Sequence, residues 1–270
     1  MNHKNPFFSP HIMGIINTTP DSFYEKSRST NRLSLIERCD KLLKEGATII
    51  DIGGESTRPG FSPVSYDEEK KRVIPAIIEL KQYFDSLFIS VDTQKSAIAD
   101  AALKNGANMI NDIWGLQNPD DPKMAQVISD YKAYCVIMHN RKTIDSSINI
   151  IKDIETFFLR SLNIAKKNGI PKEKIILDPG IGFGKTLEQN YIVLKQIKRF
   201  KHFCMPILLG TSRKSLYSIL DTNNAENRLG ATVATTYYAL TQGVTIFRVH
   251  DVQENYQAIK LYNHLKSIKA

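Results

Sequence analysis

Polar residues and glycines follow a short apolar run at eight points along the chain. The eight groups are Asn17, residues 51–54, Asp92, residues 111–112, His139 and residues 178–180, 210–212 and 248–250. In a barrel of parallel strands the carboxyl ends of all strands lie on one face, so these groups would converge in one pocket. A pocket that combines amides, carboxylates and cations can orient a small polar substrate. The spacing therefore predicts an enzyme.

The last two of these groups contain candidate anion-binding residues. Residues 210–215 are predicted to end a strand and begin a helix, where free backbone N–H groups would lie beside Arg213 and Lys214. Arg248 and His250 are two residues apart at the last strand end, so strand alternation places them on the same side. Both segments predict binding of an anionic ligand.

A glycine-rich segment follows the predicted sixth strand, where residues 178–186 read Asp-Pro-Gly-Ile-Gly-Phe-Gly-Lys-Thr. A Walker A loop needs glycine five residues before Gly184, and the chain has Pro179 there. The dinucleotide fingerprint also fails, because it needs two residues between its second and third glycines. The segment predicts instead a turn whose backbone approaches a flat ligand, with Asp178 as a hydrogen-bond acceptor.

The segment 51–60 places carboxylates, hydroxyls and an arginine after a predicted strand. A polar surface loop is the simplest interpretation of such a composition. Thr57 and Arg58 are nevertheless predicted to meet a ligand, because Pro59 and the glycine after it turn the chain immediately.

Several reactive side chains are expected to be structural. Glu55 is expected to be held by a neighbouring loop. His139 could be a base, but a buried histidine bonded to a neighbouring loop is the favoured interpretation. Cys39, Cys135 and Cys204 are odd in number and widely spaced, so no disulfide framework or zinc site fits them, and all three are expected to be reduced.

The elements that must position these groups repeat one pattern, an amphipathic helix, a glycine and then an apolar strand. Gly46, Gly106, Gly169 and Gly243 stand at the expected helix ends, where glycine permits a left-handed cap. Apolar strands that alternate with helices predict a parallel sheet buried on both faces. Eight such units in 270 residues fit a single (β/α)8 TIM barrel over residues 1–270 better than an open doubly wound sheet.

Composition limits the possible partners. The net charge of +8 fits an anionic ligand or a nucleic acid. The basic clusters at 195–201 and 260–269 are spaced as on outer helix faces and lack the interleaved aromatics of a single-strand binding surface, which argues against nucleic acid. No apolar stretch approaches the roughly 18 residues that would span a bilayer, and residues 1–8 lack the apolar core of a signal peptide. A cytoplasmic location is therefore expected.

In chain order, eight segments resemble the dihydropteroate synthase family. The segments are residues 13–23, 51–60, 90–93, 111–113, 138–139, 178–185, 212–215 and 248–251. The resemblance implies condensation of 6-hydroxymethyl-7,8-dihydropterin pyrophosphate with 4-aminobenzoate in folate synthesis. It also implies Mg²⁺ as cofactor and a homodimer.

The resemblance assigns roles on the pterin side of the site. Asp92, Asn111 and Asp178 would accept hydrogen bonds from the donor edge of the pterin. Lys214 would reach its carbonyl and ring nitrogen, and Arg248 would pack against the ring. Among these, Lys214, Arg248 and Asp92 would be the catalytic residues.

The resemblance also assigns roles on the other two sides. His250, Arg248 and Asn17 would hold the pyrophosphate, with Asn17 as the one protein ligand of Mg²⁺. The family is thought to release pyrophosphate first, leaving a cationic pterin methylene that the aromatic amine attacks. The expected aminobenzoate side is Thr57, Arg58, Pro59, Phe183 and Ser215.

One departure from the family pattern leaves alternatives open. After Asp21-Ser22-Phe23 the family commonly has an acidic residue and two glycines, whereas this chain has Glu25-Lys26-Ser27. A synthase-like paralogue that binds pterin without turnover is one alternative. A methyltetrahydrofolate methyltransferase-like barrel is the other, although such an enzyme would have little use for Lys214 beside Arg248 and His250.

Overall fold

The computed structural model describes residues 5–18, 28–55, 64–220 and 224–268. Within these ranges eight parallel strands form one sheet in the order β6-β5-β4-β3-β2-β1-β8-β7. The strands are β1 (His11–Asn17), β2 (Ile49–Gly53), β3 (Ile89–Asp92), β4 (Met109–Asp112), β5 (Tyr134–Met138), β6 (Ile175–Asp178), β7 (Leu208–Leu209) and β8 (Ile246–Val249). A parallel bridge between Leu177 and Ile207 joins β6 to the start of β7 and closes the sheet. The predicted TIM barrel is confirmed.

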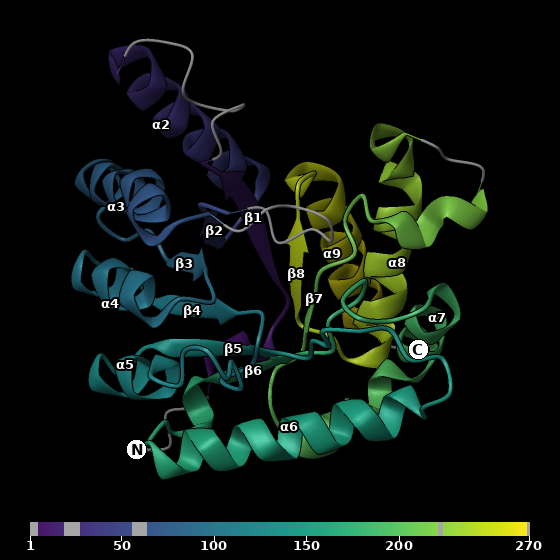
Figure 1. The fold of residues 1–270 in the computed structure, drawn as a ribbon. Helices are drawn as coiled ribbons and strands as arrows, with labels where there is room; N and C mark the ends of the chain where they lie inside the picture. Colours follow the sequence, from purple (N-terminus) through teal and green to yellow (C-terminus); the bar gives the residue numbers. More distant parts are fainter. Residues whose placement is uncertain (1–4, 19–27, 56–63, 221–223, 269–270) are drawn as a thin grey trace.

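Helices surround the strands in chain order (Figure 1). The α-helices are α2 (Arg28–Glu45), α3 (Tyr66–Tyr83), α4 (Ser96–Lys104), α5 (Met124–Asp130), α6 (Ile150–Lys167), α7 (Leu187–Gln196), α8 (Leu229–Gln242) and α9 (Val252–Ser267). The 3₁₀ helices are η1 (Pro6–Phe8), η2 (Lys172–Lys174), η3 (Ile197–Phe203), η4 (Ser215–Leu220) and η5 (Ala225–Arg228). No helix in the described part of the chain is long and apolar enough to cross a membrane.

The predicted glycine helix ends are confirmed. Gly243 caps α8 in the left-handed conformation at φ 95°. Gly46 follows α2 at φ 111°, and a Cβ there would lie 2.4 Å from the Tyr256 ring. At both positions, any other residue would be strained.

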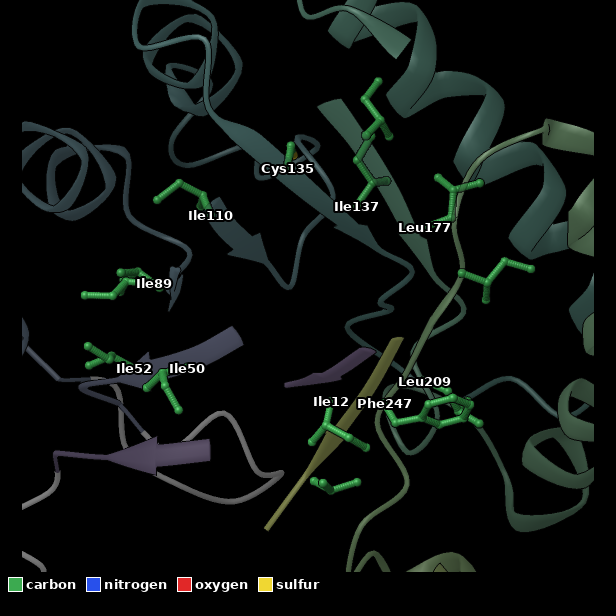
Figure 2. Close-up of a cluster of buried hydrophobic side chains, with 14 of the residues drawn as sticks. Ile12, Ile50, Ile52, Ile89, Ile110, Cys135, Ile137, Leu177, Leu209 and Phe247 are labelled. Atoms are coloured by element: carbon green, nitrogen blue, oxygen red, sulfur yellow. The ribbon is translucent and has the colours of Figure 1, made fainter. Parts of the chain in front are cut away.

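Strand alternation divides the buried residues into two cores. One set faces the helices, and Figure 2 shows ten of its members by label. The labelled residues are Ile12, Ile50, Ile52, Ile89, Ile110, Cys135, Ile137, Leu177, Leu209 and Phe247. The alternate positions form a second cluster that fills the interior of the barrel, made of Phe7, Met13, Ile49, Met109, Val136, Ile176, Leu208 and Ile246. The barrel is therefore packed below its carboxyl face rather than open through its length.

On several strands, the residue two positions after a member of the apolar interior cluster is polar. Because side chains at i and i+2 share a face, Asp51 follows Ile49, Asn111 follows Met109, Asp178 follows Ile176 and Arg248 follows Ile246 on the same side. The apolar interior cluster thus forms the floor of a polar layer at the carboxyl ends of the strands. This arrangement confirms the predicted convergence for these strand ends.

The cysteines are free within the described residues, but they do not share one environment. Cys39 and Cys135 are buried, whereas Cys204 is exposed and ends η3 in the left-handed conformation.

Candidate active site

An arginine from the last strand joins two carboxylates from the second and third strands. Arg248 Nε lies 2.6 Å from Asp51 Oδ2, and its Nη2 lies 2.7 Å from Asp92 Oδ2. Asp51 is completely buried and Asp92 nearly so. The cluster therefore links β8, β2 and β3 across the polar layer through two charge-assisted hydrogen bonds.

Burial controls the protonation of this cluster. Desolvation raises the pKa of Asp92 to about 7, although Arg248 opposes the shift. Burial alone would lower the pKa of Arg248, but Asp51 and Asp92 raise it above its ordinary value. Arg248 is therefore a permanent cation, and the pKa of Asp92 depends on the positive charge of Arg248 beside it.

Four buried acceptor atoms in this region have no hydrogen-bond partner among the described protein groups. They are Asp51 Oδ1, Ser90 Oγ, Asp92 Oδ1 and Asn111 Oδ1. Leaving a buried acceptor unsatisfied costs about 1–3 kcal/mol, so such a set indicates a ligand that supplies several hydrogen-bond donors. The parallel register pairs Asp51 with Ser90, and Asp92 with Asn111, which places the four atoms on adjacent strands. Of these, Ser90 and Asp51 were not predicted as binding residues.

The segment after β6 and the segment after β7 meet beside Asp178. Lys214 Nζ donates to Ile181 O at 2.5 Å and lies 4.7 Å from the centroid of the Phe183 ring. Asp178 Oδ1 accepts from Gly180 N at 2.7 Å. Burial raises the pKa of Asp178, and Lys214 is the largest opposing influence. The structure therefore brings together Asp178, Phe183 and Lys214.

The segment 210–215 differs from its prediction. A helix does begin here, the six-residue 3₁₀ helix η4 that starts at Ser215, but the backbone N–H groups before it are not all free. Lys214 N donates to Thr211 O, and Arg213 N donates to Thr232 Oγ1. The expectation of free backbone N–H groups is therefore wrong at these two residues.

The side chains near this segment also divide between two roles. Arg213 forms two hydrogen bonds with Asp251, at 2.5 and 3.0 Å, and is turned to that carboxylate. Ser212 Oγ lies 3.1 Å from His250 Nδ1, and the same hydroxyl accepts from His250 N at 3.2 Å. Ser212 thus fixes the ring of His250 at the mouth of the barrel.

His139 is a buried structural histidine, which confirms the favoured interpretation. Its Nε2 lies 3.0 Å from Asp153 Oδ2, and its Nδ1 lies 2.8 Å from Lys185 Nζ. Burial lowers the pKa of His139 to about 4, with only partial opposition from Asp153. Neither Lys185 nor Asp153 was predicted to contribute to this part of the molecule.

The glycine-rich turn packs directly against the backbone after β5. Gly180 has φ 67°, and a Cβ there would lie 1.9 Å from His139 O. We expect Gly180→Ala to lower the free energy of unfolding by more than the roughly 1–2 kcal/mol of a left-handed alanine, because the clash adds to the strain. Urea unfolding measures the change. Gly230→Ala is the control, since nothing lies within 4 Å of a Cβ at that position; equal losses in both variants would contradict the expectation.

Glu55 is held by a neighbouring element, as predicted. Lys95 Nζ lies 2.5 Å from Glu55 Oε2 and 2.5 Å from Glu69 Oε2. Thr93 Oγ1 donates to the other oxygen of Glu69 at 2.7 Å. This network fixes the chain just before residues 56–63. Thr57, Arg58 and Pro59, and the altered segment Glu25-Lys26-Ser27, lie outside the described residues.

Asn17 is the candidate magnesium ligand, and its surroundings fit that role. Its side chain is at the exposed end of β1. A Cβ built on Gly53 would lie 3.7 Å from both Asn17 Oδ1 and Asp92 Cβ, so the amide borders the Asp51–Arg248–Asp92 cluster. Groups of three or more His, Cys, Asp or Glu side chains that could hold a metal do not occur among the described residues. A hard amide oxygen suits Mg²⁺, which commonly takes few protein ligands and completes its shell with substrate phosphates and water.

Comparisons with known proteins identify the family of the chain. A family described as pterin binding enzyme matches residues 13–250. The dihydropteroate synthase of Clostridium beijerinckii is 44% identical over 252 residues, which are 93% of this chain and 92% of the relative. A Clostridium difficile dihydropteroate synthase structure, determined in the presence of pteroic acid, is 45% identical with a TM-score of 0.91, covering 98% of this chain and 99% of that chain. A Xanthomonas albilineans dihydropteroate synthase structure with 4-aminobenzoic acid is 33% identical with a TM-score of 0.90, covering 97% and 95%.

A closed parallel barrel with buried acceptors and cations at its carboxyl face, matched to this family over most of its length, defines a pterin-binding barrel enzyme. Within that class the chain belongs to the dihydropteroate synthases, which are transferases of folate biosynthesis. The predicted family and enzyme class are confirmed.

Proposed function

We propose that the chain joins 6-hydroxymethyl-7,8-dihydropterin pyrophosphate to 4-aminobenzoate, giving 7,8-dihydropteroate and pyrophosphate. The observation that carries this proposal is the set of unpartnered buried acceptors on β2, β3 and β4 beside the cations Arg248 and Lys214. An aminopyrimidine edge supplies the N–H donors that such acceptors require. The related structures with pteroic acid and 4-aminobenzoic acid support the same pair of substrates.

The pterin would lie across the polar layer of the barrel. Asp92 Oδ1 and Asn111 Oδ1 would accept from its donor edge, because both atoms are buried without a protein partner. Asp178 would add a third acceptor on β6. Lys214 Nζ would donate to the ring carbonyl while keeping its hydrogen bond with Ile181 O, because an ammonium group has three N–H donors. Donors and acceptors of the protein would then match those at the edge of the pterin ring.

The pyrophosphate would lie toward β1 and β8. Arg248 and His250 would stabilise the charge that develops on the leaving oxygen, since both lie at the carboxyl end of β8. Mg²⁺, held by Asn17, would neutralise phosphate charge when bound. The carboxylates of Asp51 and Asp92 would favour positive charge on the pterin methylene after the C–O bond breaks. Attack by the aromatic amine then needs only the loss of one proton.

The 4-aminobenzoate would approach from the side of the glycine-rich turn. The Phe183 ring contacts Lys214 there, and Ser215 directly follows Lys214 at the start of η4. The residues proposed to line this side are Thr57, Arg58, Pro59, Phe183 and Ser215. Phe183 would stack against the benzoate ring, and Arg58 would neutralise its carboxylate.

We also propose that the protein acts as a homodimer in the cytoplasm, without nucleic acid or a membrane as partner. Apolar side chains on α8 and α9 are exposed, among them Tyr238, Leu261 and Leu265, and would be available to a subunit interface. Light scattering on the purified protein would give the mass of a dimer if this is correct. A mass equal to one chain at micromolar concentration would contradict it.

Pyrophosphate release from the purified protein tests the proposed reaction. We expect sustained, multiple-turnover release only when dihydropterin pyrophosphate, 4-aminobenzoate and Mg²⁺ are all present, and we expect EDTA to abolish it. Product should appear as 7,8-dihydropteroate in equal amount. Pterin binding without turnover would instead support the inactive paralogue. The family assignment favours the synthase over the methyltransferase-like alternative.

A further inference from the structure

Lys185 is a buried cation to which the proposed reaction assigns no task. Its Nζ lies 2.8 Å from His139 Nδ1, 2.7 Å from Gly180 O and 3.0 Å from Phe183 O. An ammonium group has three N–H donors, so each donor has one acceptor. The side chain is buried, and a buried, fully satisfied cation is held in one position.

The other end of the network fixes the state of His139. Asp153 Oδ2 lies 3.0 Å from His139 Nε2 and 2.9 Å from Arg141 Nη1. The hydrogen bond from His139 lowers the pKa of Asp153 to about 2, and burial lowers the pKa of His139 to about 4. At neutral pH the carboxylate is charged and the imidazole is neutral. Because a carboxylate only accepts, Nε2 carries the hydrogen and Nδ1 accepts from Lys185.

The turn that Lys185 binds also carries the groups that contact Lys214. Gly180 O and Phe183 O are the two ends of this turn, and Lys185 Nζ bonds to both. Between them, Ile181 O accepts from Lys214 Nζ, and the Phe183 ring lies under the same ammonium group. A shift of the turn would therefore move both of these contacts of Lys214 together.

We propose that Lys185 is a positioning residue for the substrate site, which holds the turn 180–183 so that Ile181 and Phe183 orient Lys214. The inference rests on the roles of Lys214 and Phe183 in the function proposed above. Lys185 acts through the turn and through His139, and it contacts neither substrate. It couples the segment after β5 to the segment after β6 at the edge of the pocket.

The network requires Lys185 to be protonated. Burial lowers the pKa of Lys185 to about 7, and Asp178 is the largest opposing influence. A neutral amine keeps two donors for three acceptors, and it can accept from Nδ1 only if His139 moves its hydrogen away from Asp153. One hydrogen bond is lost in either case. The charged and titratable groups that face Lys185 are His139, Arg141, Asp153, Asp178 and Lys214.

Steady-state kinetics of Lys185→Met, measured below and above the wild-type Lys185 pKa of about 7, test the inference. We expect KM for 4-aminobenzoate to rise about ten-fold below the pKa of Lys185, less than the 10²-fold that a 1 Å misplacement can cost. We also expect the wild-type kcat/KM to fall as pH rises through about 7, and this fall to be absent in Lys185→Met. A lysine with a purely structural role would not control this fall in kcat/KM at alkaline pH.

Lys81→Met is the matched control. Lys81 also has a lowered pKa from burial and donates to a backbone carbonyl, Leu87 O at 2.6 Å, but it lies at the opposite end of the barrel. We expect Lys81→Met to keep the wild-type KM and the wild-type fall in kcat/KM as pH rises through about 7. If Lys185→Met kept both the wild-type KM and the fall in kcat/KM above pH 7, the inference would be overturned. The proposed function would still stand in that case, because it is tested separately by turnover of the wild-type protein. Loss of this fall in Lys81→Met would also overturn the inference.

A measurement on the wild-type chain covers the case in which Lys185→Met does not fold. Amide hydrogen exchange of residues 180–184, corrected for the intrinsic effect of pH, should show protection below the pKa of Lys185 and loss of protection about one pH unit above it. The loss should be confined to this turn and the segment after β5. Unchanged protection across that range would overturn the inference.

Discussion

Replacing Arg248 by methionine is expected to abolish most turnover and to destabilise the protein at neutral pH. The guanidinium group is the shared partner of Asp51 and Asp92, both of which are buried. Removing one member of a buried ion pair costs about 3–5 kcal/mol, because the remaining charge is left uncompensated. Loss of the charge that stabilises the leaving group should lower kcat by about 10²–10³-fold. Urea unfolding and pyrophosphate release measure the two effects.

The stability loss in Arg248→Met should depend on pH. Asp92 has a folded pKa of about 7, above its unfolded value, so its contribution to stability is present at low pH and lost as pH rises through about 7. Arg248 is the largest influence that lowers this pKa. Without it the folded pKa rises further, so the decline in unfolding free energy should extend to higher pH. The difference from wild type should therefore be largest above neutrality.

A second substitution separates the two effects of Arg248. Adding Asp51→Asn to Arg248→Met removes one buried carboxylate, so part of the stability should return while turnover stays low. Arg199→Met is the control for loss of an arginine, because its exposed pair with Glu155 at 3.3 Å should contribute at most about 1 kcal/mol. A stable, active Arg248→Met would show that the cluster is dispensable.

Strand alternation explains how far the sequence could predict this site. Asp178 and Arg248 each stand two residues after an apolar interior residue at the end of a strand, so their place in the pocket follows from periodicity. Asp51 has the same position relative to Ile49. Its partner, Arg248, lies 197 residues away in the chain. Nothing local in the sequence indicates that contact.

Contacts between loops account for what the sequence could not predict. Lys185 reaches His139 across 46 residues, and Arg213 turns to Asp251 across 38 residues. The sequence places all four after strand ends, but it does not say which of two adjacent cations faces the pocket. Arg213, at φ 57°, is directed to Asp251, whereas Lys214 is directed to Ile181 and Phe183. The choice depends on backbone conformation between β7 and η4.

Lys214→Ala should lose activity without losing the fold. Lys214 is only partly buried, so the free energy of unfolding should change by less than about 1 kcal/mol. Its ammonium group is the donor proposed for the pterin carbonyl, and a hydrogen bond between a charged and a neutral group contributes about 1.5–3 kcal/mol to binding. Since that donor would also hold the ring as positive charge develops, kcat/KM should fall by about 10²-fold or more.

Two further variants show whether the position or only the charge of Lys214 matters. Lys214→Arg keeps the charge but replaces a compact ammonium by a planar guanidinium, so it should restore little activity. Lys195→Ala removes an exposed lysine at the end of α7 and should remain within about two-fold of wild type. Wild-type activity in Lys214→Ala would contradict the proposed contact with the pterin. Recovery by Lys214→Arg would mean that net positive charge beside Asp178 is sufficient, and that the hydrogen bond to the ring carbonyl is not required.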